Sequence, residues 1–187
     1  MKHYLALLLL LLPAARVAAQ NGIQFEHERS LDDALAKAKA EGKAVFMDAY
    51  TTWCGPCRLM ATKTFTDSAL GAYFNARFVN LKMDMEKGEG PALAQRYGVE
   101  YYPTLLFLNP DGARVHKVVG YYNAGDFLKV GTTAMDPAAN LLALETRYRQ
   151  GERSADLLRT LTEAKSAAVD ASSVELANDY LKTQTDL

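Results

Sequence analysis

Cysteine is scarce in this chain of 187 residues, which contains only Cys54 and Cys57. Two cysteines are too few for the disulfide framework that holds small exported domains together. A structural zinc site usually takes four ligands, and the histidines at positions 3, 27 and 116 form no pair at a ligand-like spacing. The sequence therefore predicts no bound metal, and nothing in it indicates a cofactor.

Charge of one sign and long apolar runs are also lacking. The chain has 21 basic and 22 acidic residues, a formal net charge of −1. This balance argues against nucleic acid and against an anionic membrane surface as partners. The longest unbroken apolar run covers residues 4–12. It is shorter than the roughly 20 residues that a transmembrane helix needs.

The N-terminus instead has the pattern of a secretory signal peptide. Lys2 supplies a positive charge, residues 4–12 an apolar segment and Val17-Ala18-Ala19 a small-residue cleavage site. We predict a signal peptide at residues 1–19, cleaved after Ala19, and export of the remaining chain. An uncleaved anchor is the alternative. No cysteine follows the apolar segment closely, so a lipid-modified N-terminal cysteine is excluded.

The two cysteines stand in the motif Trp53-Cys54-Gly55-Pro56-Cys57. Residues 43–50 have the pattern of a buried strand and residues 58–63 that of a helix, which places Cys54 near a helix start. The unpaired N–H groups there favour a thiolate, so we expect the pKa of the Cys54 thiol to lie below its usual value of about 8.5. Cys57 lies three residues on, on the same helical face, where it can attack a mixed disulfide at Cys54.

Two other roles are open to such a pair. Half of a zinc site would need ligands that the chain does not offer. A purely structural disulfide would close almost no loop and would stabilise little. The chain is 49% apolar and long enough to bury a core without disulfides. We therefore interpret the two cysteines as a redox pair.

Apolar periodicity and turn residues predict an α/β domain. The order of elements is β-α-β-α-β-α-β-β-α, and the last two strands form an antiparallel hairpin around Asn109-Pro110-Asp111-Gly112. The predicted strands are 23–27, 43–50, 78–83, 104–108 and 114–119. The predicted helical stretches are 31–40, 58–63, 68–74, 92–97 and 124–132, of which 58–63 and 68–74 count as one α in this order. Alternation followed by a hairpin implies a mixed sheet with helices on both faces.

Residues 136–187 have a different pattern. Three amphipathic helices are marked by Leu141, Leu157 and Val174 with their periodic neighbours, and Gly151 separates the first two. This segment contains no histidine or cysteine. It either pads the domain, or forms a small helical hairpin, or belongs to a helical-repeat binding module. Fewer than two repeat units would fit, whereas such arrays generally need three.

Taken together, these features resemble the thioredoxin superfamily over about residues 22–133. The motif at residues 53–57 matches its active site as found in thioredoxins proper. Asp48 stands six residues before Cys54, where the family has a buried carboxylate. Tyr102-Pro103-Thr104 stands where the family has its cis-proline, and Gly120 matches the glycine after the final strand.

Two segments resemble the exported branch of this superfamily. Thr64-Phe65-Thr66-Asp67 is similar to the periplasmic C-terminal domain of thiol:disulfide interchange reductases, and the helical extension to exported thioredoxin-like proteins of Bacteroidetes-type bacteria. The resemblance implies a thioredoxin fold at residues 20–135, a helical extension at 136–187 and a location in a bacterial periplasm.

The resemblance also implies roles for individual residues. Cys54 and Cys57 would form a redox-active disulfide. Burial would raise the pKa of Asp48, which could then relay the proton of Cys57. A cis bond before Pro103 would turn the Tyr102 backbone toward the cysteines, where it can pair with an extended substrate. Trp53 and Tyr102 would offer that substrate a flat apolar surface.

Blander alternatives exist for these residues. Asp48 could be a polar residue at a strand end whose hydrogen bonds are all made, with no part in the chemistry. Trp53 and Tyr102 could be ordinary, partly buried side chains that bind no substrate. The chain also departs from the family pattern. Asn80 stands where thioredoxins have a lysine near the buried aspartate, and Lys82, on the same strand face, is a candidate substitute. Tyr50 replaces a usual tryptophan, which we interpret as core variation.

The sequence thus predicts an exported, monomeric dithiol oxidoreductase that acts on protein disulfides. Gly-Pro between the cysteines is the reducing type in this family, which favours a reductase fed by a membrane electron donor. No stable membrane insertion is expected after cleavage. The alternatives are an oxidase or isomerase on the same fold, or a non-enzymatic binding module that acts through the helical tail. The intact cysteine pair and Asp48 argue against the binding module.

Overall fold

A computed structural model of the protein describes residues 22–26 and 30–185; the predicted signal peptide, residues 1–19, lies outside these ranges. Five strands form one sheet in the order β1-β3-β2-β4-β5. In it β1, β3 and β2 are parallel, whereas β4 and β5 are each antiparallel to their neighbour. This confirms the predicted mixed sheet and terminal hairpin. The strands are β1 (Phe25–Glu26), β2 (Ala44–Tyr50), β3 (Phe78–Asp84), β4 (Thr104–Leu108) and β5 (Arg114–Val119).

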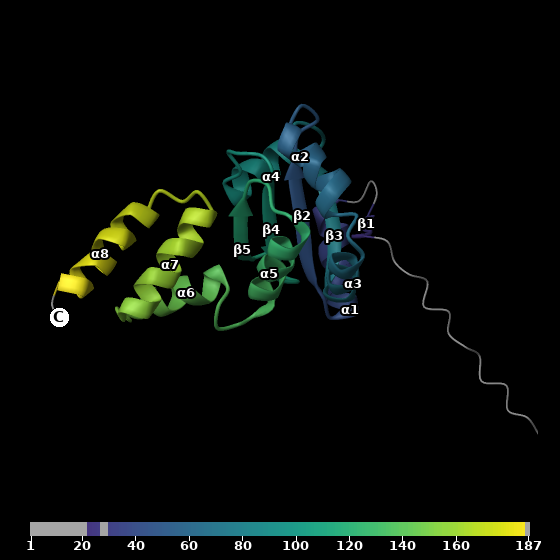
Figure 1. Ribbon diagram of the computed structural model, residues 1–187. Coiled ribbons are helices and arrows are strands. Elements are labelled where there is room, and N and C mark those ends of the chain that lie inside the picture. The colour runs from purple at the N-terminus through teal and green to yellow at the C-terminus, as the bar shows by residue number, and fades with distance from the viewer. Residues whose placement is uncertain (1–21, 27–29, 186–187) are drawn as a thin grey trace, which may run out of the picture.

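Helices cover both faces of this sheet (Figure 1). One face is covered by α1 (Leu31–Glu41) and α4 (Gly90–Tyr97). The other face is covered by the π-helix η1 (Met60–Thr64), α3 (Ser68–Arg77) and α5 (Ala124–Met135), and the short α2 (Gly55–Leu59) leads into η1. The chain therefore folds as the predicted α/β sandwich of helix, sheet and helix.

Phenylalanine rings fill the core on the η1 side. Phe46 of β2 stacks on Phe107 of β4 with ring centroids 5.3 Å apart, and it also meets Phe74 at 5.2 Å and Phe127 at 5.3 Å. These spacings are typical of favourable aromatic pairs. Because side chains alternate along a strand, Asp48, two residues after Phe46, points to the same face. The core thus fixes the direction of the carboxylate.

The helix starts follow the capping residues in the sequence. Ser30 Oγ accepts a hydrogen bond from the Asp33 N–H (3.1 Å), and Asn123 Oδ1 accepts one from the Asp126 N–H (2.9 Å). Gly42 ends α1 in the left-handed conformation, with φ 64°. Side-chain caps of this kind satisfy N–H groups that have no partner within the helix.

Several predicted element ends were wrong by two or three residues. α3 continues to Arg77 and α5 to Met135, because packing against the sheet holds their last turns. α4 begins at Gly90 rather than at residue 92, with Pro91 in its first turn, where the missing N–H costs nothing. Among the described residues of the predicted first strand, only Phe25 and Glu26 pair in the sheet.

The C-terminal segment forms three helices with a core of their own. They are α6 (Leu141–Arg149), α7 (Ala155–Ala167) and α8 (Ser173–Thr185). The buried residues at their centre are Leu141, Leu144, Leu157, Leu158, Leu161, Ala168 and Leu176. None of these residues belongs to either cluster on the faces of the sheet. The predicted boundary at residue 135/136 falls at the end of α5, and the division into two domains stays a prediction.

The extension lies beyond β5, on the side of the sheet away from β1 (Figure 1). The Leu141 N–H donates a hydrogen bond to His116 Nδ1 (3.1 Å), and Arg114 pairs with Glu145 at 3.4 Å. Burial, helped by Arg114, lowers the pKa of His116 to about 4. The ring is therefore neutral at pH 7 and can accept this bond, which joins α6 to β5.

The end of α7 is strained. The Val169 N–H bonds to the Ser166 carbonyl and the Asp170 N–H to the Lys165 carbonyl, so Val169 occupies the position after the helix that usually belongs to glycine. Its φ is 53°, the one positive value among the non-glycine residues that the structure describes. Gly42 and Gly98 fill the same position after α1 and α4. A side chain in this conformation costs roughly 1–2 kcal/mol.

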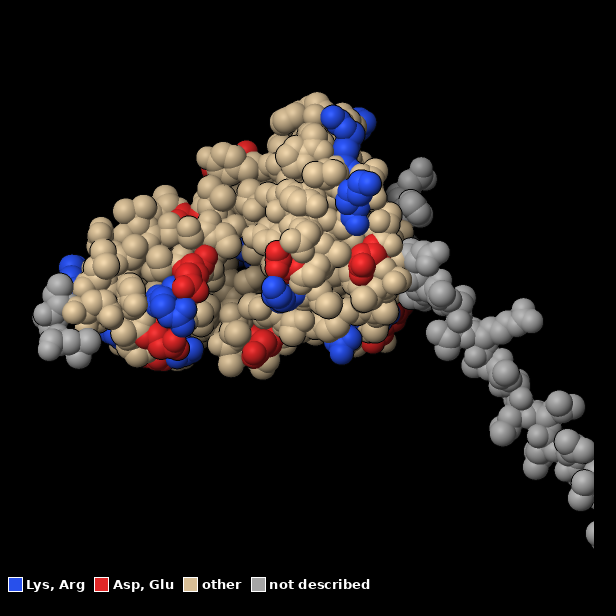
Figure 2. Space-filling model, viewed as in Figure 1, with Lys and Arg blue, Asp and Glu red and all other residues tan. Residues whose placement is uncertain are grey.

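Acidic and basic side chains alternate over the visible surface, and neither sign dominates (Figure 2). Several are paired along the extension; Arg159, for example, contacts both Asp156 (2.9 Å) and Glu163 (3.0 Å). Within the described part of the chain, no helix has the length and apolarity needed to cross a bilayer.

Candidate active site

Cys54 and Cys57 lie at the start of α2, as the sequence predicts, and are joined by a disulfide. Cys54 is the N-cap residue: its Sγ accepts a hydrogen bond from the Cys57 N–H at 3.1 Å. Both residues are only 3% exposed. An N–H directed at Cys54 Sγ stabilises a negative charge on the sulfur. It therefore favours the thiolate, which is the form of the side chain that attacks a disulfide.

The helix after the cysteines changes its winding. Residues 58–63 are helical, as predicted, but from Met60 the chain forms a π-turn, and the Phe65 N–H bonds to the Met60 carbonyl at 2.9 Å. Such π-turns lie frequently at functional sites. Thr64, the last residue of η1, donates its hydroxyl to the Tyr122 carbonyl at 2.6 Å. The α2–η1 segment is therefore tied to the start of α5.

Asp48 and Lys82 form an ion pair inside the sheet. They lie side by side on β2 and β3, and Lys82 Nζ is 2.9 Å from Asp48 Oδ2. Asp48 is 1% exposed, whereas the Lys82 side chain keeps 29% of its surface exposed. Burial raises the pKa of Asp48, and the charge and hydrogen bond of Lys82 oppose this without cancelling it. The lysine that the sequence suggested as a substitute does contact the carboxylate.

Aromatic rings surround the Lys82 ammonium. Its Nζ lies 4.5 Å from the ring centre of Tyr50, 5.7 Å from Phe25 and 5.8 Å from Phe65. These distances are typical of cation–π contacts. The interpretation of Tyr50 as a core residue was therefore wrong. Tyr50 is half-buried at the end of β2, where its ring covers Lys82.

A cavity of about 180 Å³ opens beside Cys57. Its lining includes Thr51, Cys57, Arg58 and Lys82. Two buried oxygens in this region, Asp48 Oδ1 and Thr51 Oγ1, have no hydrogen-bond partner among the described residues. The walls of this cavity are mainly apolar, and unpartnered oxygens such as these are the groups to which a water molecule there can bond.

Trp53 and Tyr102 meet beside the cysteines, as the sequence suggested. Their rings pack edge to face with centroids 5.8 Å apart, and Trp53 remains 63% exposed. The Trp53 Nε1–H donates to Glu86 Oε1 at 2.9 Å. Burial, with smaller contributions from Glu86 and Asp84, raises the pKa of Tyr102.

The Tyr102–Pro103 peptide bond is cis. The Pro103 carbonyl accepts a hydrogen bond from the Gly120 N–H (2.8 Å), and the Thr104 hydroxyl donates to the Tyr101 carbonyl (2.7 Å). Gly120 has a φ of 98°, which favours glycine. These bonds fix the loop before β4 and place Tyr102 against Trp53.

Comparison with known proteins places this site in a family. The sequence model of the thioredoxin-like domain matches residues 31–134, more than half of the chain. The chain belongs to the thioredoxin-like family. It shares the cysteine pair and the general chemistry of the thiol:disulfide oxidoreductases in that family.

Three relatives show how far this thioredoxin-like similarity extends. Thiol:disulfide interchange protein DsbD 2 of Pseudomonas aeruginosa is 36% identical over 101 residues, which cover 52% of this chain and 17% of that protein. Thioredoxin H-type of Oryza sativa is 38% identical over 109 residues, covering 56% and 81%. The solution structure of a candidate disulphide-isomerase from Bacteroides thetaiotaomicron is 48% identical, with a TM-score of 0.57, and covers 64% of this chain and 98% of that one. The chain thus spans less than a fifth of the interchange protein.

The thioredoxin-like site also contains a residue that sequence reasoning missed. Glu86 lies in the segment between β3 and α4, outside every predicted strand and helix. Its contact with Trp53 spans 33 positions. No local sequence pattern predicts such a contact, because it depends on the conformation of the folded loop.

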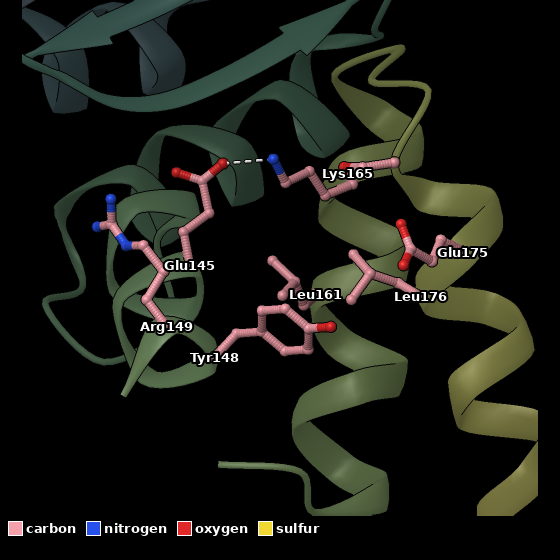
Figure 3. A pocket seen from close by; sticks show the side chains of 8 residues that line it. Glu145, Tyr148, Arg149, Leu161, Lys165, Glu175 and Leu176 are labelled. Atoms are coloured by element: carbon pink, nitrogen blue, oxygen red, sulfur yellow. Dashed lines mark ion pairs between the residues drawn. The ribbon is translucent and has the colours of Figure 1, made fainter. Parts of the chain in front are cut away.

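A separate cavity of about 270 Å³ lies among the three C-terminal helices. Tyr148, Leu161 and Leu176 converge on its middle, and Lys165 pairs with Glu145 (2.6 Å) along one side (Figure 3). Its lining comes only from the extension and includes neither cysteine. The chemistry of this thioredoxin-like chain therefore belongs to the α2 site and not to this cavity.

Proposed function

We propose that this chain is an exported dithiol reductase of protein disulfides. The observation that carries the proposal is the cysteine pair at the start of α2, above a buried Asp48–Lys82 pair. A hydrogen bond to Cys54 Sγ favours its thiolate, and a buried carboxylate of raised pKa suits proton transfer near neutral pH.

In the first step the Cys54 thiolate attacks one sulfur of a substrate disulfide. A bond forms between Cys54 Sγ and that sulfur, and the substrate disulfide breaks, so the other substrate sulfur leaves as a thiolate. The hydrogen bond from the Cys57 N–H holds the attacking charge before the reaction. The product is a mixed disulfide between protein and substrate.

In the second step Cys57 resolves this intermediate. Asp48 takes the Cys57 proton through water in the adjoining cavity, and the Cys57 thiolate attacks Cys54 Sγ. The substrate leaves with two more electrons and with its second sulfur as a thiolate; its two thiolates take up protons from water, and the protein is left with the Cys54–Cys57 disulfide. Lys82 acts as a positioning residue, because its contact holds Asp48 and stabilises the carboxylate before it takes the proton.

The substrate segment binds along the loop before β4. The Tyr102 backbone pairs with an extended stretch of substrate, Pro103 shapes that backbone, and the exposed Trp53 ring covers the other side. Glu86 fixes the Trp53 ring through its hydrogen bond. These contacts hold the substrate disulfide in line with Cys54.

Export follows from the predicted signal peptide at residues 1–19, and the similarity to the interchange protein supports work in the periplasm. Regeneration of the dithiol in the periplasm requires an electron donor in the membrane, because no glutathione pool keeps that compartment at a reducing potential. The substrates are protein disulfides.

The reduction potential of the Cys54–Cys57 pair tests whether the protein reduces protein disulfides. The mature protein is equilibrated against dithiothreitol or glutathione, and the oxidised fraction is measured. We expect a value near or below about −250 mV, as for reductases of this class. A value near about −120 to −180 mV would contradict the reductase.

Isomerisation of protein disulfides is the second candidate function. It is favoured by the 48% identity to a Bacteroides protein described as a candidate disulphide-isomerase. The same measurement separates the two, since isomerases have potentials near about −180 mV. A Cys54→Ser variant that kept every cellular phenotype would instead favour a binding module acting through α6–α8.

A further inference from the structure

His116 joins strand β5 to the first turn of α6. The residue is 5% exposed, and its Nδ1 accepts a hydrogen bond from the Leu141 N–H at 3.1 Å. Leu141 is the first residue of α6, where a backbone N–H has no partner within its own helix. A side chain of the sheet thus supplies the acceptor that the first helix of the extension needs.

This hydrogen bond requires a neutral ring. A neutral histidine has one ring proton, so Nδ1 can accept only while that proton is on Nε2, whereas a protonated ring donates from both nitrogens. Protonation would set the Nδ1–H of His116 against the Leu141 N–H, two donors face to face. It would also place a positive charge at the N-terminus of α6, which is the positive end of the helix dipole. Protonation of the ring therefore opposes the docking of α6 on β5.

The charged groups around His116 do not compensate for a positive ring. Burial and, to a smaller extent, the positive charge of Arg114 lower the pKa of His116 to about 4. The Glu145 carboxylate of α6 already contacts Arg114 at 3.4 Å and Lys165 of α7 at 2.6 Å. On β4, Phe107 offers only its ring, 6.0 Å from that of His116. Other charged groups on the elements around β5 are engaged elsewhere, namely Lys117 with the Gly98 carbonyl, Asp170 with Lys165, and Lys129 of α5 with Asp126.

Apart from these polar contacts, the joint between the sheet and the extension is small. The buried core of α6–α8 shares no residue with the clusters on the two faces of the sheet. Within the part of the chain that the structure describes, Ala167 is the apolar residue of the extension that packs on the sheet core. The bond between Leu141 and His116 is therefore a large part of what holds α6 on β5.

We propose that His116 is an acid-sensitive switch for the docking of the extension. The neutral ring holds α6 on β5 at neutral pH. In mild acid the ring takes up a proton, the bond to Leu141 is lost, and the extension leaves β5 while the sheet and the α6–α8 core each stay folded. The inference goes beyond the proposed function and does not depend on it, because neither the cysteines nor Asp48 takes part.

The two states of the joint differ in their affinity for the proton. In the released state His116 is open to solvent and has its ordinary pKa of 6.5, whereas docking lowers the pKa to about 4. Docking is therefore at full strength above pH 6.5 and weakens as the pH falls toward 4, by at most about tenfold per pH unit. From these two values, the docking constant should fall about 20-fold between pH 7 and pH 5.

Hydrogen exchange at the Leu141 amide measures docking, because this N–H bonds to His116 across the joint. Exchange is followed by NMR in the whole protein at pH 7 and pH 5 and corrected for the intrinsic rate at each pH. The protection factor of Leu141 should be about 20-fold lower at pH 5. Amides in β2, in β4 and in the middle of α7 should keep their protection.

His116→Asn keeps an acceptor in place of Nδ1 but cannot take up a proton, so its Leu141 amide should be equally protected at both pH values. Glu145→Gln is the matched control. It removes the carboxylate of the joint and leaves His116, so it should keep the 20-fold fall. If His116→Asn does not fold, the parent and Glu145→Gln decide the matter.

Equal protection of Leu141 at the two pH values in the parent would overturn the inference, and so would the same fall in His116→Asn. A fall that disappears in Glu145→Gln would assign the switch to the carboxylate instead. A fall shared by the amides of β2 and β4 would mean that acid loosens the whole fold, which also contradicts a switch at this joint. None of these measurements involves thiol chemistry, so their failure leaves the proposed reductase intact.

Discussion

A single buried carboxylate, that of Asp48, affects the stability of the chain and is assigned a part in the proposed chemistry of the cysteine pair. Burial raises the pKa of Asp48, and Lys82 offsets only part of this increase. The folded chain therefore holds the Asp48 proton more tightly than the unfolded chain does. The stability that this gives is complete below the ordinary pKa of 3.8 and is lost as the pH rises through the higher folded-state pKa.

Asp48→Asn should stabilise the protein at pH 8 and slow its chemistry. The amide cannot ionise, so the loss of stability with rising pH disappears. The stabilities of the variant and the parent should therefore become equal as the pH falls toward 4. Without a proton acceptor for Cys57, resolution of the mixed disulfide should slow by about 100-fold. Thermal denaturation from pH 4 to 9 and rapid-mixing kinetics measure the two effects.

Asp111→Asn is the matched control for this prediction. Asp111 is an exposed carboxylate paired with Lys39 at 3.2 Å, so its removal should change neither the pH dependence nor the rate. A loss of stability in Asp48→Asn that is larger at pH 8 than at pH 4 would contradict a raised pKa, because it would mean that folding favours the charged form of Asp48.

The residues of the site differ in how far sequence alone could place them. The cysteine pair and Asp48 are set by spacing within one strand–turn–helix unit, and Lys82 by alternation on the neighbouring strand. Glu86 depends on a loop conformation that no periodicity encodes. The positive φ of Val169 was not predicted, because nothing about a valine in the sequence indicates this conformation. Side chains fixed by element geometry were therefore predictable, and those fixed by loop geometry were not.

Elements were predictable in kind but less so in detail. Capping residues such as Ser30 and Asn123 announce where helices begin. The π-turn of η1 was not foreseen, because the side-chain pattern of one such turn differs little from that of an α-helix. It depends on tertiary contacts such as that of Thr64 with the Tyr122 carbonyl.

The packing of α3 depends on a glycine. A Cβ at Gly71 would lie 2.2 Å from the Gly22 carbonyl oxygen, so Gly71→Ala must push α3 away from the segment before β1. We expect a loss of about 2–3 kcal/mol in the free energy of unfolding, typical of overpacking. Denaturant titration measures it.

Gly125→Ala is the matched control, in the first turn of α5. Its nearest neighbour would be Asn123 Oδ1 at 3.6 Å, an ordinary contact. Alanine favours helix over glycine, so this variant should be neutral or more stable by up to about 1 kcal/mol. A Gly71→Ala variant as stable as Gly125→Ala would mean that helix propensity, and not the close approach to Gly22, dominates at Gly71.

For the molecule as a whole, the separate core of α6–α8 predicts a separate unit of stability. Leu161 is 1% exposed at the centre of that core. Leu161→Ala should cost the extension about 2–5 kcal/mol. Hydrogen exchange should then speed up in α6–α8, whereas amides of β2 and β4 keep their protection.

Leu106→Ala provides the comparison, because Leu106 belongs to the core of the sheet. It should reduce protection throughout β2 and β4. Uniform loss of protection in Leu161→Ala would show instead that contacts such as Arg114–Glu145 make the two parts one cooperative unit.

The place of the extension beyond β5 has a consequence for how the sheet meets other polypeptide chains. A β-sheet edge is a template on which foreign segments can add as new strands, and it invites aggregation. At one edge of this sheet β1 is only two residues long, and at the other α6 and α7 contact β5. Both edges are thus blunted, so a foreign chain finds little free backbone for pairing along the rims of the sheet.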